Sequence, residues 1–245
     1  MKYFVRPGQV SYGESIGILL LENYAPFIPG DTANATTYGY PVRFRRVPGL
    51  SVERIFNHDA SMYEALKAAA MELKREGVRA ITGDCGFMAL FQQQLAKELG
   101  IPVFLSSLLQ LPFMGLIVGP KKPIGVVTAN KTALIPEVFS WAGVSEELRD
   151  RLVVKGLEDD QHFVDAVFTE NGMLDSEIVE SAVVKRAVDM QKEHHDLGAI
   201  LLECSMLPPY GAAVAEATGL PVFDYVTMID YVHATVVKRR FHGHM

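Results

Sequence analysis

Residues 80–104 read AITGDCGFMALFQQQLAKELGIPVF, and residues 199–223 repeat the pattern as AILLECSMLPPYGAAVAEATGLPVF. The two segments align without a gap, and in each an acidic residue followed by a cysteine stands at the same position. In both copies a short apolar run ends at the cysteine, roughly a dozen residues of helical character follow, and a glycine precedes the next apolar pair. Glycine commonly ends helices, so each copy predicts a strand, a helix and a second strand. This is the repeating unit of a parallel sheet.

Apolar and amphipathic runs outside these segments extend the duplication. Residues 16–21 and 124–129 each predict an opening strand, and residues 151–155 predict another strand in the second half. Helices are expected at about 59–76 and 176–194, just before each repeated segment. The order of elements is therefore the same in both halves of the chain.

Residues with helix-ending chemistry mark the bounds of these two expected helices. Asp59 and Ser176 are candidate N-caps, because short polar side chains accept hydrogen bonds from the free N–H groups of a first helical turn. Gly77 is a candidate stop for the first helix, since glycine adopts the left-handed conformation that often follows a last turn.

The duplicated order predicts an α/β fold of two similar lobes, each a parallel sheet flanked by helices, related by a pseudo-two-fold axis. We expect the first lobe to comprise residues 1–113 together with 225–245, which return to it as a C-terminal helix, and the second to comprise residues 114–224. Open α/β sheets bind ligands at the carboxyl ends of their strands. An active site is therefore expected in the cleft between the lobes.

Composition excludes several classes of protein. The chain has 245 residues, of which 49% are hydrophobic and 21% charged, and its formal net charge is -6. These values are typical of a globular protein and leave no basic face for nucleic acid, so no nucleic-acid partner is expected. The short basic run at 238–240 is interpreted as a solvated helix end.

The sequence also predicts a cytoplasmic protein without a membrane span. Two cysteines are too few for a disulfide scaffold, and the first residues lack the basic and apolar regions of a signal peptide. The uncharged run at 99–120 is long enough to cross a bilayer, but Pro102, Pro112 and Gly115 interrupt it. We interpret this run as a buried strand, a turn and a second apolar segment.

Cys85 and Cys204 are the residues from which the functional prediction starts. Each stands where a strand ends and a helix begins, and the N–H groups of a helix start favour thiolate over thiol. Asp84 and Glu203 would oppose this effect if they pointed at the sulfur atoms, and the sequence leaves their direction open. Duplication of a buried structural cysteine is the alternative interpretation.

Two thiols on opposite walls of a cleft can invert a stereocentre without a cofactor. One thiolate removes a proton from a carbon acid, and the opposing thiol returns a proton to the other face. Each cysteine is then the base for one enantiomer and the acid for the other. Neither a metal nor a nucleotide is expected, because the histidines lack ligand spacing and no glycine-rich phosphate loop is present.

Three motifs resemble the aspartate/glutamate/hydantoin racemase superfamily: GDCGF at 83–87, LECSMLPPY at 202–210, and TANKT at 128–132. The resemblance extends from about residue 16 to about residue 236. It implies a two-lobed, cofactor-independent enzyme with Cys85 and Cys204 as its catalytic residues. It also implies a set of substrate-binding residues, which are Gly86, Phe87, Thr128, Asn130, Thr132, Ser205 and Met206.

The residues after each cysteine depart from the superfamily's amino-acid racemases. Those enzymes commonly carry Asn-Thr and Thr-His, where this chain has Gly86-Phe87 and Ser205-Met206. The more apolar pocket that results suits a hydantoin or another bulkier carbon acid rather than free aspartate or glutamate.

These observations predict a racemase or epimerase that acts beside a carbonyl, with an amino acid, another small carboxylate or a cyclic ureide as substrate. A maleate isomerase-like or arylmalonate decarboxylase-like enzyme of the same superfamily is the first alternative. A two-lobed protein that binds a small ligand without turnover is the second. A homo-oligomer is expected on the frequency of such assemblies alone.

Overall fold

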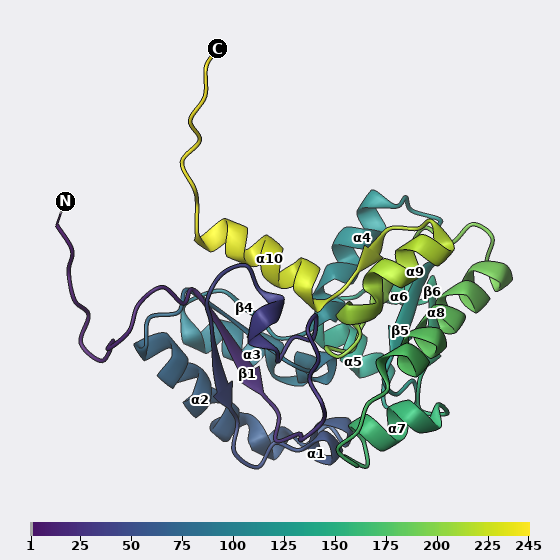
Figure 1. The fold of residues 1–245 in the computed structure, drawn as a ribbon, viewed down its shortest axis with the longest axis horizontal. Helices are drawn as coiled ribbons and strands as arrows, with labels where there is room; N and C mark the ends of the chain where they lie inside the picture. Colours follow the sequence, from purple (N-terminus) through teal and green to yellow (C-terminus); the bar gives the residue numbers. More distant parts are fainter. Residues whose placement is uncertain (1) are drawn as a thin grey trace.

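The computed structural model describes residues 2–245 and contains two four-stranded parallel sheets (Figure 1). The strand order is β2-β1-β3-β4 in the first sheet and β6-β5-β7-β8 in the second. The strands of the first sheet are β1 (Ile16–Leu20), β2 (Val42–Arg46), β3 (Ala80–Gly83) and β4 (Val103–Phe104). Those of the second are β5 (Ile124–Thr128), β6 (Leu152–Gly156), β7 (Ala199–Leu202) and β8 (Val222–Phe223). Helices flank both sheets, which confirms the predicted fold class.

The two sheets pair their strands in the same register. Ile16 of β1 lies opposite Ala80 of β3, and Ile124 of β5 lies opposite Ala199 of β7. In each sheet the strand that ends before the cysteine lies between the opening strand and a two-residue edge strand. The duplication seen in the sequence is therefore a duplication of the sheet.

Strand β2 was not predicted from the sequence, because its three arginines interrupt the apolar run that is typical of a buried strand. Its sequence is VRFRR, and it forms the edge of the first sheet. Arg43 pairs with Glu14 and Glu76, while Arg45 pairs with Glu72 and Glu76. Charged side chains on an edge strand oppose pairing with other chains.

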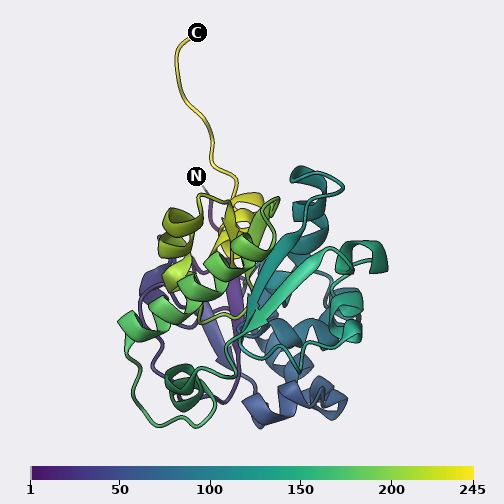
Figure 2. The ribbon, with the colours of Figure 1, turned by 90° about the vertical axis from the view of Figure 1, so that its right-hand side faces the viewer.

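Helices cover the sheets in the predicted order. The larger ones are α2 (Tyr63–Arg75), α3 (Ala89–Leu99), α8 (Ser176–Glu193), α9 (Gly211–Thr218) and α10 (Tyr225–Val236). The shorter ones are α1 (Val52–Phe56), α4 (Leu111–Ile117), α5 (Pro136–Trp141), α6 (Glu146–Arg149) and α7 (Gln161–Val167). Figure 2 faces the second half and shows the green α8 beside the teal strands of its sheet.

The helix ends follow their sequence signals with one exception. Gly100 and Gly219 end α3 and α9 with φ of 70° and 67°, a conformation that costs other residues energy. Asp59 caps a 3₁₀ turn that leads into α2. The prediction that Ser176 caps α8 was wrong, because the side chain of Asp175 accepts the free N–H groups and Ser176 is the first helical residue.

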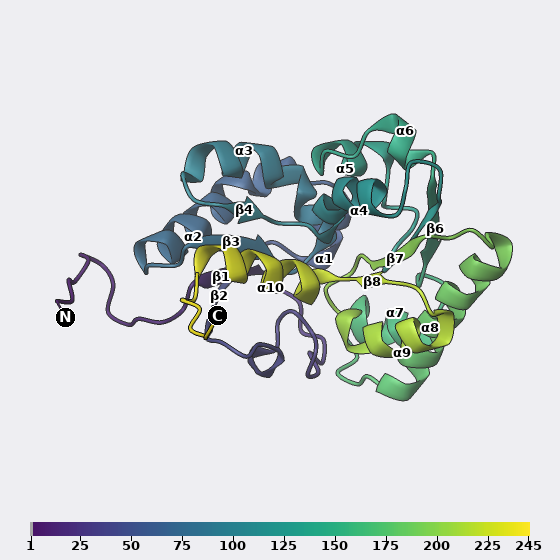
Figure 3. The same ribbon diagram turned by 90° about the horizontal axis from the view of Figure 1, so that it is seen from above.

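Helix α10 returns to the first sheet, which it crosses in Figure 3. Tyr225, Met228 and Ile229 pack against Ile16 and Ile18 of β1. The uncharged run at residues 99–120 is divided among β4, a 3₁₀ turn and α4. Within residues 2–245, no helix combines the length and apolar character needed to cross a membrane.

One cluster of buried apolar side chains spans both sheets. Leu19, Leu66 and Leu95 of the first half belong to it together with Ile124 and Val138 of the second. Helices α3 and α5 provide much of this contact between the halves. The relative position of the two sheets is therefore held by ordinary hydrophobic packing.

Phe139→Ala tests this shared core, because Phe139 of α5 is only 5% exposed and packs within the cluster. We expect a loss of about 3–5 kcal/mol in the free energy of unfolding, from lost burial and a cavity. Chemical denaturation should still give one transition for both halves. Phe241→Ala, at an 83% exposed position, is the matched control and should change stability by less than about 0.5 kcal/mol. Two separate transitions would contradict the shared core.

Candidate active site

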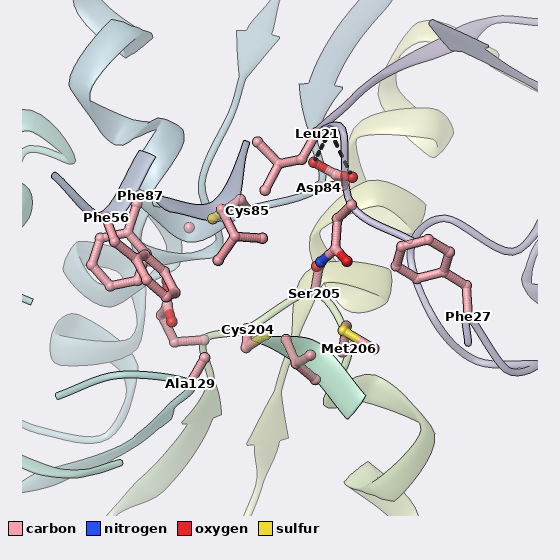
Figure 4. Close-up of a pocket in the computed structure, with 15 residues that line it drawn as sticks. Leu21, Phe27, Phe56, Asp84, Cys85, Phe87, Ala129, Cys204, Ser205 and Met206 are labelled. Atoms are coloured by element: carbon pink, nitrogen blue, oxygen red, sulfur yellow. Dashed lines mark hydrogen bonds between the residues drawn. The ribbon is translucent and has the colours of Figure 1, made fainter. Parts of the chain in front are cut away.

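Both cysteines line one small cavity at the carboxyl ends of β3 and β7 (Figure 4). Cys85 follows β3 directly after Asp84, and Cys204 follows β7 directly after Glu203. Figure 4 shows the two cysteines on opposite sides of the cavity. Its volume is about 30 Å³, which is room for a few water molecules. The wall consists of Leu21, Asn23, Phe27, Val52, Phe56, Asp84, Cys85, Gly86, Phe87, Ala129, Val167, Glu203, Cys204, Ser205 and Met206.

The two cysteines have matching backbone surroundings. The N–H of Phe87 faces the sulfur of Cys85, and the N–H of Met206 faces the sulfur of Cys204. The carbonyl of each cysteine accepts a hydrogen bond of 3.0 Å from the residue three positions later. These N–H groups stabilise a negative charge on either sulfur.

Burial opposes this stabilisation and has the larger effect on the pKa of both thiols. It raises the pKa of the Cys85 thiol well above its usual value, and the charges of Glu203, Cys204 and Asp84 add to the effect. Burial likewise raises the pKa of the Cys204 thiol, with Glu203 as the next contributor. Both cysteines are therefore harder to ionise than a free cysteine, mainly because they are buried and secondly because negative groups surround them.

Asp84 and Glu203 are site residues that the sequence analysis did not assign. Both oxygens of Asp84 accept the backbone N–H of Leu21 at 3.1 Å, and one oxygen of Glu203 accepts the hydroxyl of Thr128 at 2.8 Å. Burial raises the pKa of each carboxyl to about 7. Their matching positions before the two cysteines were the signal that could have identified them.

The predicted substrate-binding residues divide into two groups. Gly86, Phe87, Ser205 and Met206 line the cavity beside the cysteines. Thr128, Asn130 and Thr132 are not among the lining residues, and their loop contributes Ala129 instead.

Thr128, Asn130 and Thr132 make contacts within the protein. Thr128 is fully buried and donates to Glu203, so its hydroxyl positions that carboxyl. The side-chain oxygen of Asn130 accepts from the N–H and hydroxyl of Thr132 and from the N–H of Ala133. The contacts of Asn130 with Thr132 and Ala133 form a turn at the surface and stabilise the loop.

A loop between β1 and β2 closes one side of the cavity. It supplies Asn23 and Phe27 to the wall. The N–H and the hydroxyl of Thr32 both donate to the carbonyl of Ser205 at 3.2 Å, which ties the loop to the second half. Opposite this loop, the rings of Phe56 and Phe87 meet edge to face, with centroids 4.8 Å apart.

The charge of the cavity restricts what it can bind. Two carboxyl groups lie in the wall, and no lysine, arginine or histidine accompanies them among the lining residues. A dianion would be repelled by the carboxylates and would find no cationic side chain there. A compact molecule with a positive group beside aromatic rings is the better fit.

Solved structures share this fold. An allantoin racemase from Klebsiella pneumoniae aligns over 91% of this chain and 89% of its own, with a TM-score of 0.62 and 16% identity. Structures of arylmalonate decarboxylase, glutamate racemase and aspartate racemase also align, with TM-scores of 0.58, 0.56 and 0.53. The resemblance to the aspartate/glutamate/hydantoin racemase superfamily is thus confirmed at the level of the fold.

Sequence comparison gives nearer relatives, although no family model matches the chain. A dimethylsulfoniopropionate lyase of Durusdinium sp. clade D is 35% identical over 223 residues, which cover 89% of this chain and 73% of that protein. Dimethylsulfoniopropionate lyase 3 of Emiliania huxleyi is 34% identical over 91% of this chain and 60% of its own length. By its similarity to the Durusdinium protein, the chain belongs to the dimethylsulfoniopropionate lyase family.

Proposed function

We propose that this chain is a lyase that acts on dimethylsulfoniopropionate or a closely similar β-sulfonio carboxylate. The observation that carries the proposal is the 35% identity, over 89% of the chain, to a protein named for this activity. The cavity supports it, because a small site with two thiols, two carboxyls and aromatic rings suits a compact zwitterion.

The reaction is an elimination that needs one base. A cysteine thiolate takes a proton from the carbon beside the carboxylate, and the C–H electron pair forms the new carbon–carbon double bond. The bond from the next carbon to the sulfonium sulfur breaks, and its electron pair stays on sulfur. The products are dimethyl sulfide, acrylate and a protonated cysteine, so nothing is oxidised or reduced and no cofactor is consumed.

The surroundings of the cysteines suit the charges of such a substrate in the reaction. The N–H groups behind the sulfurs of Cys85 and Cys204 favour negative charge, which develops beside the carboxylate as the proton leaves. The rings of Phe56 and Phe87, which lie on the wall that carries Cys85 and Gly86, would attract the sulfonium.

The positive charge of the substrate also activates the base. Bound near the carboxyls and thiols, the sulfonium offsets the negative surroundings that help raise the pKa of both cysteines. The thiolate therefore forms more easily in the complex than in the free protein. A protein with buried, unreactive thiols would become reactive only when the correct substrate is present.

Racemisation or epimerisation beside a carbonyl is the second candidate. The observation that favours it is the matching placement of Cys85 and Cys204, each with a backbone N–H on its sulfur. A two-base inversion requires both thiols, whereas the elimination requires one. This difference separates the two functions experimentally.

Cys85→Ser and Cys204→Ser are expected to have unequal effects on acrylate formation from dimethylsulfoniopropionate. The variant that lacks the base should lose about 10²-fold or more in kcat, while the other retains most of its activity. Gas chromatography of dimethyl sulfide measures the rate, and circular dichroism checks the fold. Equal loss in both variants, with wild-type protein that exchanges and inverts a substrate stereocentre in D₂O, would favour the racemase.

The raised thiol pKa predicts two different pH profiles. The value of kcat/KM reports the free protein and should rise with pH through the alkaline range, above the usual thiol value of about 8.5. The value of kcat reports the complex, where the sulfonium lowers the thiol pKa, so its rise should occur at lower pH. Initial rates at saturating and limiting substrate measure both. Coincident profiles would contradict activation by the substrate's charge.

A further inference from the structure

One carboxyl oxygen of Glu203 is hydrogen-bonded within the protein, and the other has no hydrogen-bond partner. Its Oε2 accepts the hydroxyl of Thr128 at 2.8 Å, while Oε1 is buried and has no hydrogen-bond partner. Its backbone is also fixed, because its N–H donates to Val127 at 2.8 Å and its carbonyl accepts the hydroxyl of Ser107 at 2.7 Å. A buried carboxyl oxygen without a partner is costly, which indicates that a ligand completes the contact.

Gly86 provides the space in which this oxygen lies. A Cβ added at Gly86 would come within 1.5 Å of Oε1, so any larger residue would displace the carboxyl. Gly86 directly follows Cys85, and both line the cavity with Glu203. The oxygen therefore lies at the wall that carries Cys85, although Glu203 itself precedes Cys204 on the opposite wall.

Asp84 is the counterpart of Glu203 in the first repeat, and its carboxyl is hydrogen-bonded differently. Both of its oxygens already accept the N–H of Leu21. Neither carboxyl has a basic partner among the residues that line the cavity. Of the two acids, Glu203 is the one with an unused acceptor.

We propose that Glu203 is the specificity-determining residue that receives the onium group of the substrate through its unpartnered Oε1. The proposal rests on the proposed function for the identity of that group, a sulfonium. In this position the carboxylate holds the positive end of the substrate between the two cysteines. The same contact would exclude molecules of equal shape that lack the onium charge, because they would leave the buried oxygen without a partner.

Two unreactive ligands of similar shape test whether binding depends on the positive charge of the onium group. The first is 3-(trimethylammonio)propanoate, which carries the onium charge on a poorer leaving group than a sulfide. The second is 4,4-dimethylpentanoate, in which a neutral carbon replaces the nitrogen. Calorimetric titration at about pH 8, where a carboxyl with a pKa of about 7 is ionised, gives a dissociation constant for each.

For the wild-type protein we expect the onium ligand to bind at least about tenfold more tightly than the carbon analogue, which keeps the carboxylate but lacks the positive charge. Glu203→Gln keeps the size of the side chain and should bring the ratio of the two constants close to one. Gly86→Ala displaces the carboxyl without removing its charge, and it should also lower the ratio, which provides a second test if Glu203→Gln fails to fold. Glu137→Gln, the same change at an exposed position on α5, should leave the ratio unchanged.

The outcomes distinguish this proposal from the proposed function. An unchanged ratio in Glu203→Gln and Gly86→Ala, or a wild-type protein without preference for the onium ligand, would overturn the role of Glu203. Preference that depends on Glu203, in a protein that releases no dimethyl sulfide, would support the role and overturn the lyase. Preference together with lyase activity would support both.

Discussion

Burial of two acid–cysteine pairs in one enclosed space is the constraint on which the rest of the site depends. Residues 84–85 and 203–204 each end a central strand, and the geometry of the two sheets brings them to the same cavity. Low-dielectric surroundings penalise the charged form of every one of these groups. The nearby donors, which include the N–H of Leu21 and the hydroxyl of Thr128, compensate only part of that penalty. The site therefore holds two carboxyls whose pKa lies near 7 and two thiols that resist ionisation, and it has no cationic side chain in its wall.

The fold that this chain shares with solved racemases also suits the proposed elimination. Cys85 and Cys204 stand at matching positions just after the central strands of the two sheets. The residues that follow the cysteines, Gly86-Phe87 and Ser205-Met206, give the cavity small and apolar walls. Under the proposed function, the acids that precede the cysteines would select for the charge of the substrate.

Much of the fold could be predicted from the sequence because its signals are local. The repeated segment, the glycines at 100 and 219 and the apolar runs each specify one element without reference to the rest of the chain. Strand β2 could not be predicted in this way, since Arg43 and Arg45 are stabilised by acids that lie elsewhere in the sequence. Likewise, Asp175 and Ser176 are adjacent candidates for one cap, and only the backbone conformation distinguishes them.

The site was predictable in part for the same reason. The positions of the cysteines and of the residues after them follow from the repeat. The direction of Thr128 does not, because a side chain at a strand end can face either the cavity or the interior, and here it faces Glu203. Alternation along a strand suggested that Asp84 and Glu203 could face away from the cysteines. Both line the cavity, because the chain leaves the regular strand just before them.

The loop that carries Phe27 and Thr32 has a kinetic consequence. It forms part of the wall and is fastened to Ser205 across the boundary between the halves. Because Ser205 directly follows Cys204, this contact couples the loop wall of the cavity to the backbone beside the second cysteine. Under the proposed function, exchange of substrate and product past this loop would depend on how often Thr32 releases the carbonyl of Ser205.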